Sequence, residues 1–289
     1  MPELPEVESY RLALQAELVS RRIKAVRILT RSVVAFPADP LAGIVRSRTD
    51  APPARARLAL LLKGDTVTSI LRHGKQLAII GCSGAAVAIH LGMTGRFSLD
   101  AAPATHVHVT WHLDDDRTLR FIDPRRFGLV AGHESFDDLR ARRWSRLGPD
   151  ALAITPKLLA AACAGSARPI KSLLLDQSRI AGIGNIYADE ALFAARVHPL
   201  EPAHNLAPDT LELLALQLQS ILAAAIDAGG STIRDHRMLV GTAGSYQNHH
   251  RVYARAGQPC NMCHELLVGL RISGRATVFC RSCQLHREK

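Results

Sequence analysis

The sequence predicts an α+β fold: an N-terminal antiparallel β-sandwich with flanking helices, then a helical half that ends in a cysteine-rich ribbon. Short apolar runs separated by turn signals fill the chain up to about residue 133. After residue 149 the apolar residues follow helical spacing instead, and two cysteine pairs stand near the C-terminus. Regular short strands favour an antiparallel sandwich, and a later run of helices favours segregated elements.

Composition and charge restrict the class of protein. The chain has 289 residues, with 36 Lys and Arg against 26 Asp and Glu, so its formal charge is +10 and its pI about 9.8. Apolar residues make up 47% and charged residues 21%, which excludes a disordered or collagen-like chain. No run reaches the ~18 apolar residues of a membrane span, and early acidic residues argue against a signal peptide. We therefore expect a cytoplasmic protein that binds a polyanion and no membrane.

The first half is expected to contain one helix and then short strands. Apolar residues at helical spacing predict a helix over residues 5–19. The stretch 37–57, rich in Ala, Pro and Arg, predicts a loop or an insertion. Segments bounded by turn signals predict strands over 25–29, 66–71, 76–80, 86–91, 106–112 and 119–123.

The second half is expected to be helical. Thr155-Pro156 and Ala207-Pro208 have the character of helix starts, and Gly229-Gly230 of a helix end. Leu and Ala spacing predicts helices over 156–164, 170–175, 185–195 and 209–228. The change from strand-like to helical spacing, followed by the cysteine-rich ribbon, predicts three domains over residues 1–150, 151–248 and 249–289.

Four of the six cysteines form one pattern: Cys260-x2-Cys263, sixteen residues, then Cys280-x2-Cys283. Each pair brings two thiolates to one side of a tight turn, and two such turns supply the four soft ligands that zinc prefers. The alternative is a pair of disulfides, which needs an oxidising compartment. The pattern predicts one structural Zn²⁺ ion.

The ribbon is also basic. Residues 250–289 contain seven Lys or Arg and two acids, a net charge of +5. A small hairpin with that surplus is suited to placing an arginine at a nucleic-acid groove, although a solvated basic surface has the same composition.

Pro2 and Glu3 form the first candidate reactive pair. Removal of Met1 would leave a secondary amine at the terminus, and an α-amino group ordinarily has a pKa of ~8, so a useful fraction is neutral at pH 7. Such an amine can attack a sugar carbon and form a Schiff base, with Glu3 as the adjacent acid or base. The alternative is a proline that only opens a helix.

Two glycine-containing motifs form further candidates. In Gly182-Ile-Gly184-Asn185 the backbone can approach an anion at a helix start, or merely make a tight turn between helices. Met93 and Phe127 stand at glycine-flanked turns near Arg125 and Arg126. Apolar wedges beside arginines suit a protein that unstacks a base, although both can also be core residues.

Taken together, these motifs resemble the formamidopyrimidine-DNA glycosylase/endonuclease VIII family of base-excision repair enzymes. The resemblance covers essentially the whole chain, because PELPEVE, HLGMTG, DPRRFG, GIGNIYADEALF, GGSTIRD and the two cysteine pairs occur in the family's order. It implies a helix–two-turn–helix DNA-binding domain before the zinc ribbon, and a monomer acting on double-stranded DNA that contains damaged bases. It also implies association with the bacterial nucleoid.

The resemblance also implies a role for each matching residue. Pro2 is the expected Schiff-base nucleophile, Glu3 the acid that protonates the sugar ring oxygen, and Glu6 a supporting carboxylate. Lys75 is expected to contact the phosphate beside the lesion. The expected DNA-binding residues form a phosphate clamp (Lys171, Asn185, Tyr187 and Arg275), a set that fills the void left by the flipped base (Met93, Arg125 and Phe127), and two further contacts, His106 and Arg126.

The implied reaction is excision of a damaged base followed by β- and δ-elimination. PELPEVE, and the length of the loop 241–247, favour oxidised purines such as 8-oxoguanine and formamidopyrimidines. Val107 stands where the family often has an aspartate, and His73 and Gln76 stand where it more often has Arg and Tyr. Two alternatives remain open: excision of oxidised pyrimidines, and a zinc-dependent protein that binds damaged DNA without catalysis.

Overall fold

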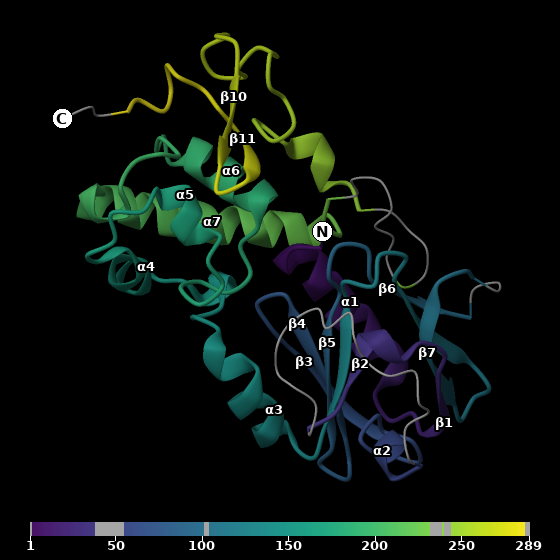
Figure 1. Cartoon of the computed structure of the whole chain (residues 1–289). Coiled ribbons are helices and arrows are strands. Elements are labelled where there is room, and N and C mark those ends of the chain that lie inside the picture. The colour runs from purple at the N-terminus through teal and green to yellow at the C-terminus, as the bar shows by residue number, and fades with distance from the viewer. Residues whose placement is uncertain (1, 38–54, 101–103, 232–238, 240–243, 287–289) are drawn as a thin grey trace. The chain divides into compact units, whose positions relative to one another are not determined.

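The computed structural model describes all residues except 1, 38–54, 101–103, 232–238, 240–243 and 287–289. The chain divides into two compact units (Figure 1). The first contains Met1–Arg146 and Gly229–Gly244, and the second contains Leu147–Ala228 and Ser245–Lys289. Each is described by itself.

The first unit is built from two β-sheets. One has four strands in the order β1-β7-β8-β6, all antiparallel. The other has five strands in the order β2-β9-β5-β4-β3, antiparallel except for the β2–β9 pair. The strands are β1 (Ile23–Ile28), β2 (Val34–Ala35), β3 (Val67–His73), β4 (Gln76–Gly81), β5 (Ala86–His90), β6 (Arg96–Leu99), β7 (Val107–Leu113), β8 (Thr118–Ile122) and β9 (Leu129–His133).

A common hydrophobic core joins the two sheets into a sandwich. Trp111 and Phe121 from the four-stranded sheet lie in one buried cluster with Ile70 and Leu77 from the five-stranded sheet. Helix α1 (Leu4–Leu18) packs against β3 and β4 and adds Leu14 to that core. This packing places the start of α1, and with it Glu3 and Pro2, beside the five-stranded sheet.

Short helical elements complete the first unit. They are η1 (Arg31–Val33), α2 (Arg55–Ala59), α3 (Phe136–Arg142) and η2 (Trp144–Arg146). Ser135 precedes helix α3 and caps it, because its hydroxyl accepts the Asp138 N–H at 3.0 Å. Helix α3 and strands β2, β6 and β9 were not predicted from the sequence.

The second unit is helical and carries the ribbon. Helix α7 packs against α4 and α6, and α5 packs against α4 and α6. The helical elements are η3 (Ala151–Ala153), α4 (Pro156–Cys163), α5 (Ile170–Leu174), α6 (Asn185–Ala194), η4 (Ala203–Asn205), α7 (Pro208–Asp227) and η5 (Tyr246–His249). By length and composition α7 could cross a membrane, but core helices of soluble proteins pass the same test.

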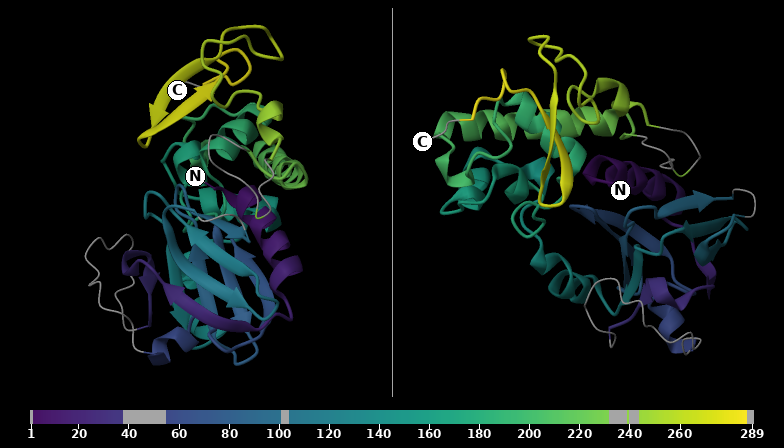
Figure 2. Two further views of the ribbon diagram at one scale, coloured as in Figure 1. Left: turned by 90° about the vertical axis from the view of Figure 1, so that its right-hand side faces the viewer. Right: turned by 45° about the horizontal axis from the view of Figure 1, so that its top comes forward.

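The ribbon is a two-stranded antiparallel hairpin, β10 (Val268–Ile272) with β11 (Arg275–Phe279). Ser273 and Gly274 form its turn with φ values of 47° and 74°, the pattern of a two-residue turn that matches strand twist. Strand β11 packs against α6, and Figure 2 shows the hairpin, in yellow, beside the helices of this unit.

The predicted α+β fold, with its sandwich, helical half and cysteine-rich hairpin, is confirmed. The division into 1–150, 151–248 and 249–289 stays a prediction. Most of the stretch 37–57, part of the loop 241–247, part of the GGSTIRD motif and Met1 lie outside the described residues.

Candidate functional site

The N-terminus of α1 is held in place by one buried carboxylate. Glu6 Oε2 accepts the Glu3 backbone N–H at 2.8 Å, and Glu6 Oε1 accepts the Ser231 backbone N–H at 2.7 Å. Pro2 is buried, and Glu3 and Glu6 are 3% and 2% exposed. Glu6 therefore fixes the backbone beside Pro2 against the segment that follows α7.

Gly230 is required for this contact. Its φ is +82°, and a Cβ there would lie 2.7 Å from Glu6 Oε1. Any side chain would push the Ser231 N–H away from the carboxylate, which explains the glycine pair between α7 and Ser231.

Lys75 lies in the turn between β3 and β4 and is 8% exposed. An ion pair ties this turn to α1, because Arg72 Nε lies 2.7 Å from Glu8 Oε2 and Arg72 Nη1 donates to Gly74 O at 3.0 Å. Glu8 and Glu3 both lie near the N-terminus of α1. The structure therefore connects the expected nucleophile segment to the expected catalytic lysine through a short, partly buried ion pair.

His90, at the end of β5, is kept neutral in this part of the sandwich. Burial, together with the charges of Lys75 and Arg143, lowers the pKa of His90 to about 4. Its Nδ1 accepts the Gly92 N–H at 3.2 Å, so the proton of the neutral ring is on Nε2. The residue adds no cation beside Lys75 at neutral pH.

The expected void-filling residues lie on two neighbouring turns. Met93 is 41% exposed, and Phe127 is half-buried with the Arg125 guanidinium 4.7 Å from its ring centre. Met93 is therefore not a core residue. Arg126 and His106 are both exposed, with φ values of 56° and 62°.

Asp123 joins these turns and was not identified from the sequence as a separate residue. It is fully buried, and its carboxylate accepts the Thr94 hydroxyl at 2.5 Å, the Gly128 N–H at 2.7 Å and the Arg125 N–H at 3.3 Å. Its carbonyl oxygen accepts from His108 Nε2 at 2.8 Å. The Asp123 carboxylate thus fixes the conformation of the loops on both sides of Phe127.

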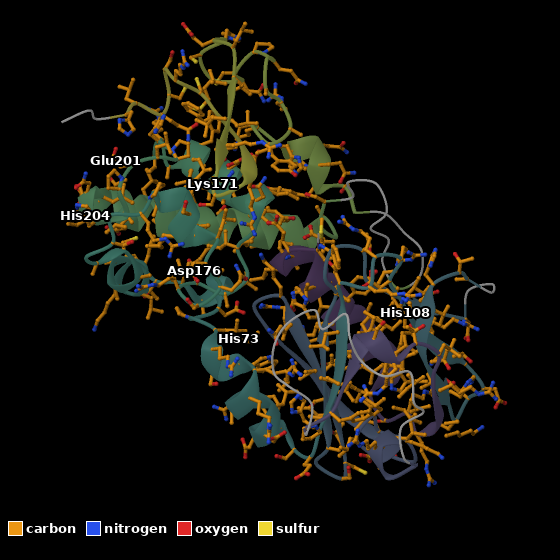
Figure 3. The ribbon with its side chains drawn as sticks, in the orientation of Figure 1. His73, His108, Lys171, Asp176, Glu201 and His204 are labelled. Atoms are coloured by element: carbon orange, nitrogen blue, oxygen red, sulfur yellow. The ribbon has the colours of Figure 1, made fainter. Side chains whose placement is uncertain are left out.

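Lys171 lies in the second unit, where Figure 3 labels it. It has no exposed surface, and its ammonium lies 2.6 Å from Asp189 Oδ1. It also donates to Thr277 Oγ1 at 2.7 Å and to Ala276 O at 3.1 Å. Asn185 donates to the same Ala276 carbonyl at 2.8 Å. The ammonium is therefore enclosed by α6 and β11, and the phosphate contact expected for Lys171 stays a prediction.

Arg275 and Tyr187 differ in exposure. Arg275 is exposed at the start of β11, directly after the hairpin turn. Tyr187 is fully buried on α6, with its ring 5.9 Å from the ring of Tyr246. The tyrosine ring is therefore packed in the interior, and the DNA contact expected for this residue stays a prediction.

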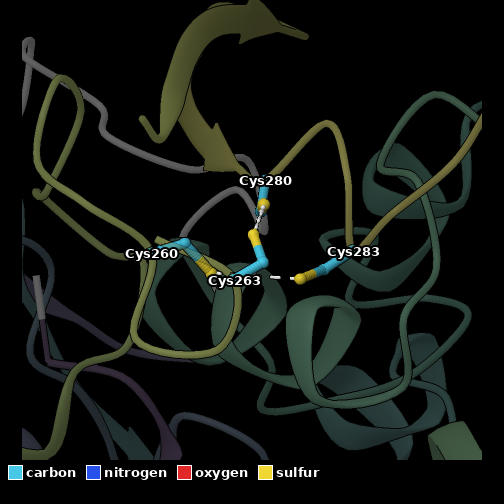
Figure 4. Close-up of side chains that lie close together, drawn as sticks. All are labelled: Cys260, Cys263, Cys280 and Cys283. Carbon is cyan, nitrogen blue, oxygen red and sulfur yellow. Dashed lines mark hydrogen bonds between the residues drawn. The ribbon is translucent and has the colours of Figure 1, made fainter. Parts of the chain in front are cut away.

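The four cysteines of the ribbon converge (Figure 4). The sulfur atoms of Cys260, Cys263, Cys280 and Cys283 all lie within 4.8 Å of one another. Backbone hydrogen bonds shape both turns: His264 N–H donates to Cys260 O at 3.0 Å, and Gln284 N–H donates to Cys280 O at 2.9 Å. Four soft ligands at this separation can hold one metal ion in tetrahedral coordination.

Two buried acids of α6 were also not identified from the sequence. Asp189 Oδ2 accepts the Val278 N–H at 3.1 Å, and Glu190 accepts the N–H groups of Arg251, Val252 and Tyr253 at 2.8–2.9 Å. Burial raises the pKa of both carboxyls, that of Asp189 to about 7. Their signal in the sequence was two adjacent acids inside an apolar helix, a position where charge needs a specific partner.

Comparison with known families gives two matches that together span most of the chain. Residues 1–130 match the formamidopyrimidine-DNA glycosylase N-terminal domain, and residues 147–237 match the H2TH domain of the same enzymes. This chain belongs to the formamidopyrimidine-DNA glycosylase family. The family consists of base-excision repair enzymes, so the family resemblance drawn from the motifs is confirmed.

Curated relatives match over nearly their full length. The formamidopyrimidine-DNA glycosylase of Chloroflexus aggregans is 39% identical, with 99% of both chains covered. That of Bacillus subtilis is 36% identical, with 98% of this chain and 99% of the relative covered.

Solved structures agree with this assignment. The MutM (Fpg) protein of Thermus thermophilus superposes with a TM-score of 0.83 at 36% identity, covering 98% of each chain. The Lactococcus lactis Fpg bound to DNA with an abasic site superposes with a TM-score of 0.85 at 31% identity, covering 99% of this chain and all of that one. Other complexes of the Lactococcus protein contain Fapy-dG DNA.

Proposed function

We propose that this chain is a bifunctional DNA glycosylase and AP lyase that excises oxidised purines from double-stranded DNA. The observation that carries the mechanism is the arrangement at the start of α1, where Glu6 holds the backbone of Glu3 beside Pro2. Relatives over the full length of the chain carry the name formamidopyrimidine-DNA glycosylase, which supports the oxidised-purine substrate class.

In the proposed reaction the Pro2 nitrogen, freed by removal of Met1, attacks C1′ of the damaged nucleotide and displaces the base. Protonation of the ring oxygen by Glu3 then breaks the C1′–O4′ bond and gives an open-chain iminium, whose C2′ proton is acidic. Loss of this proton expels the 3′ phosphate, and loss of the C4′ proton from the unsaturated iminium then expels the 5′ phosphate. Glu3 donates a proton to the sugar ring oxygen, and burial keeps this carboxyl away from bulk water. Glu6 positions the reacting backbone through its bond to the Glu3 N–H.

The remaining residues are proposed to bind the bent duplex. Lys75 and Arg275 contact phosphates beside the lesion, and Asn185 supports this contact from the first turn of α6. The two turns that carry Met93 and Phe127 enter the space left by the flipped base, with Arg125 toward the unpaired partner base. Arg126 and His106 are exposed and contribute nearby contacts.

We also propose that the metal of the ribbon is one Zn²⁺ ion held by Cys260, Cys263, Cys280 and Cys283. Because the cysteines supply four ligands, the ion would fold the hairpin and take no part in catalysis. We further propose that a monomer clamps one lesion and that the protein works inside the cell on the nucleoid; the bacterial glycosylase relatives support the intracellular part.

Borohydride trapping tests the covalent step. An 8-oxoguanine:cytosine duplex incubated with the protein and borohydride is expected to give a stable adduct, and peptide mapping is expected to place it on Pro2. Intact-mass analysis of the same preparation is expected to show that Met1 is absent.

The outcomes of that experiment separate the alternatives. An adduct on a lysine would refute the role of Pro2, and the absence of any adduct on damaged duplexes would favour a non-catalytic binder. Faster trapping on thymine glycol than on 8-oxoguanine would move the substrate class to oxidised pyrimidines.

A further inference from the structure

We propose that Lys171 and Asp189 are positioning residues: their buried ion pair fixes strand β11 on helix α6 and thereby sets the place of Arg275. Lys171 itself does not touch DNA. The inference rests on the proposed function, because it concerns how the hairpin presents its arginine to phosphate.

The first observation is that the Lys171 ammonium is surrounded by partners. It donates to Thr277 Oγ1 at 2.7 Å and to Ala276 O at 3.1 Å, and it lies 2.6 Å from Asp189 Oδ1. The side chain has no exposed surface. Contact with a phosphate would require the ammonium to leave all three partners.

The second observation is that the Lys171–Asp189 pair contacts three consecutive residues of β11. Lys171 binds Ala276 and Thr277, and Asp189 accepts the N–H of Val278 at 3.1 Å. The Thr277 hydroxyl in turn donates to the Arg275 carbonyl at 3.4 Å. The backbone of β11 is therefore fixed from the residue that follows Arg275 onward.

A second contact holds the other side of the hairpin turn. Ser172 Oγ, the neighbour of Lys171 on α5, lies 2.8 Å from Ser273 Oγ. Arg275 lies two residues after Ser273 and remains exposed. These polar contacts thus hold the chain both before and after the exposed Arg275, and they add no cation to the surface.

Physical chemistry favours a positioning role for such a pair. Two buried charges stabilise a fold weakly compared with apolar packing, but removing one partner leaves the other uncompensated. A buried ion pair is suited to specifying one geometry, and here the geometry it specifies is that of β11 on α6.

A double-mutant cycle tests the inference. Binding to a duplex with a tetrahydrofuran abasic analogue is measured over a range of salt for R275A, K171M and K171M/R275A. R275A is expected to weaken binding and to reduce the slope of log K against log salt by about one. K171M is expected to do the same, and the double variant is expected to bind within about twofold of R275A.

Two milder variants test the same inference if K171M does not fold. Thr277→Val removes only the hydroxyl that accepts from Lys171, and Asp189→Asn removes the acidic partner while leaving the lysine. Both are expected to weaken binding and to show the same coupling to R275A. A lysine that contacts phosphate directly would instead be released by Asp189→Asn, so binding would stay equal or become tighter.

K75A, in the first unit, supplies the matched control cycle. In the K171M/K75A double variant, the fold-loss of DNA affinity is expected to equal the product of the fold-losses of the two single variants, because Lys75 belongs to a different unit. Metal content and thermal unfolding of each variant report whether the ribbon is intact.

The failures are distinguishable. Suppose that R275A weakens binding, but the fold-loss of affinity in K171M/R275A equals the product of the fold-losses in K171M and R275A. In that case only the positioning inference is refuted. If R275A has no effect on binding, the phosphate contact in the proposed function is refuted, and the positioning inference falls with it.

Discussion

The buried side chain of Asp123 fixes the conformation of two surface turns, although it has no exposed surface itself. Its carboxylate binds a hydroxyl and two backbone N–H groups from the turns that carry Met93, Arg125 and Phe127. At Gly92 a Cβ would lie 2.5 Å from the Phe127 backbone, so the two turns are also in direct contact. The turns that carry Met93, Arg125 and Phe127 are therefore held against one another.

Asp123→Asn is expected to impair excision from intact duplexes more than from a substrate that has no base opposite the lesion. An amide cannot accept from both Thr94 and the Gly128 N–H, so the turns lose their fixed direction, at a cost of about 1–3 kcal/mol in stability. The measurement is kcat/KM on 8-oxoguanine:cytosine duplex and on the same lesion opposite a one-nucleotide gap.

Asp65→Asn is the matched control for this variant. Asp65 is also buried and accepts from the Cys82 thiol, the Ser83 hydroxyl and the Thr66 N–H, but in a turn that carries no expected DNA contact. Asp65→Asn is expected to lower the stability of the protein. It should not change the ratio of kcat/KM on the intact duplex to kcat/KM on the gapped substrate. Equal ratios for the two variants would contradict the role of Asp123.

Secondary-structure elements were predicted best where local signals were complete. Helix α7 begins at Pro208 and ends before the glycine pair, as Pro and Gly punctuation predicts. Strand β9 was missed because it is short and contains Gly132, which weakens a strand signal. Strand β6 was missed because it has only four residues.

The ribbon hairpin is the element expected to depend most on the proposed metal ion. Part of its apolar packing is with the cysteines themselves: Val278 and Leu267 lie in one cluster with Phe193, Val252 and the four cysteines. A chelator strong enough to strip the metal is therefore expected to unfold β10 and β11 and to abolish binding to abasic-analogue DNA, because Arg275 loses its support.

Hydrogen exchange of the amides of residues 268–279, before and after chelation, measures this loss directly. Amides of β3 to β5 in the sandwich provide the internal control and are expected to keep their protection. Full DNA binding by metal-free protein would show that the hairpin folds without the ion.

Over the entire chain, partly buried histidines couple folding to pH. The pKa of His90 is lowered to about 4, first by burial and then by Lys75 and Arg143, and burial lowers the pKa of His250 to about 4. In the unfolded chain both titrate near 6.5, so the unfolded state binds more protons as the pH falls from 6.5 to 4. Stability contributed by these neutral rings is present above pH 6.5 and is lost across that range.

His90→Gln is expected to flatten this dependence. The difference in unfolding free energy between pH 7.5 and 4.5 should shrink by up to about 3 kcal/mol relative to the unmodified protein, since a pKa change of one corresponds to about 1.4 kcal/mol. Urea unfolding at the two pH values measures it. An unchanged difference would mean that His90 is protonated in the folded protein at pH 4.5.

Sequence spacing alone determined the features that depend on neighbours along the chain. Two CxxC turns place four sulfurs together, and Pro2-Glu3 opens a helix, because short turns and helix starts are set by adjacent residues. The surroundings of Lys171 and Asp123 were decided by tertiary structure. Lys171 meets Ala276 and Thr277 across 105 and 106 residues. Only such distant packing decides whether a charge faces water or the interior, and so whether it contacts a ligand or positions another residue.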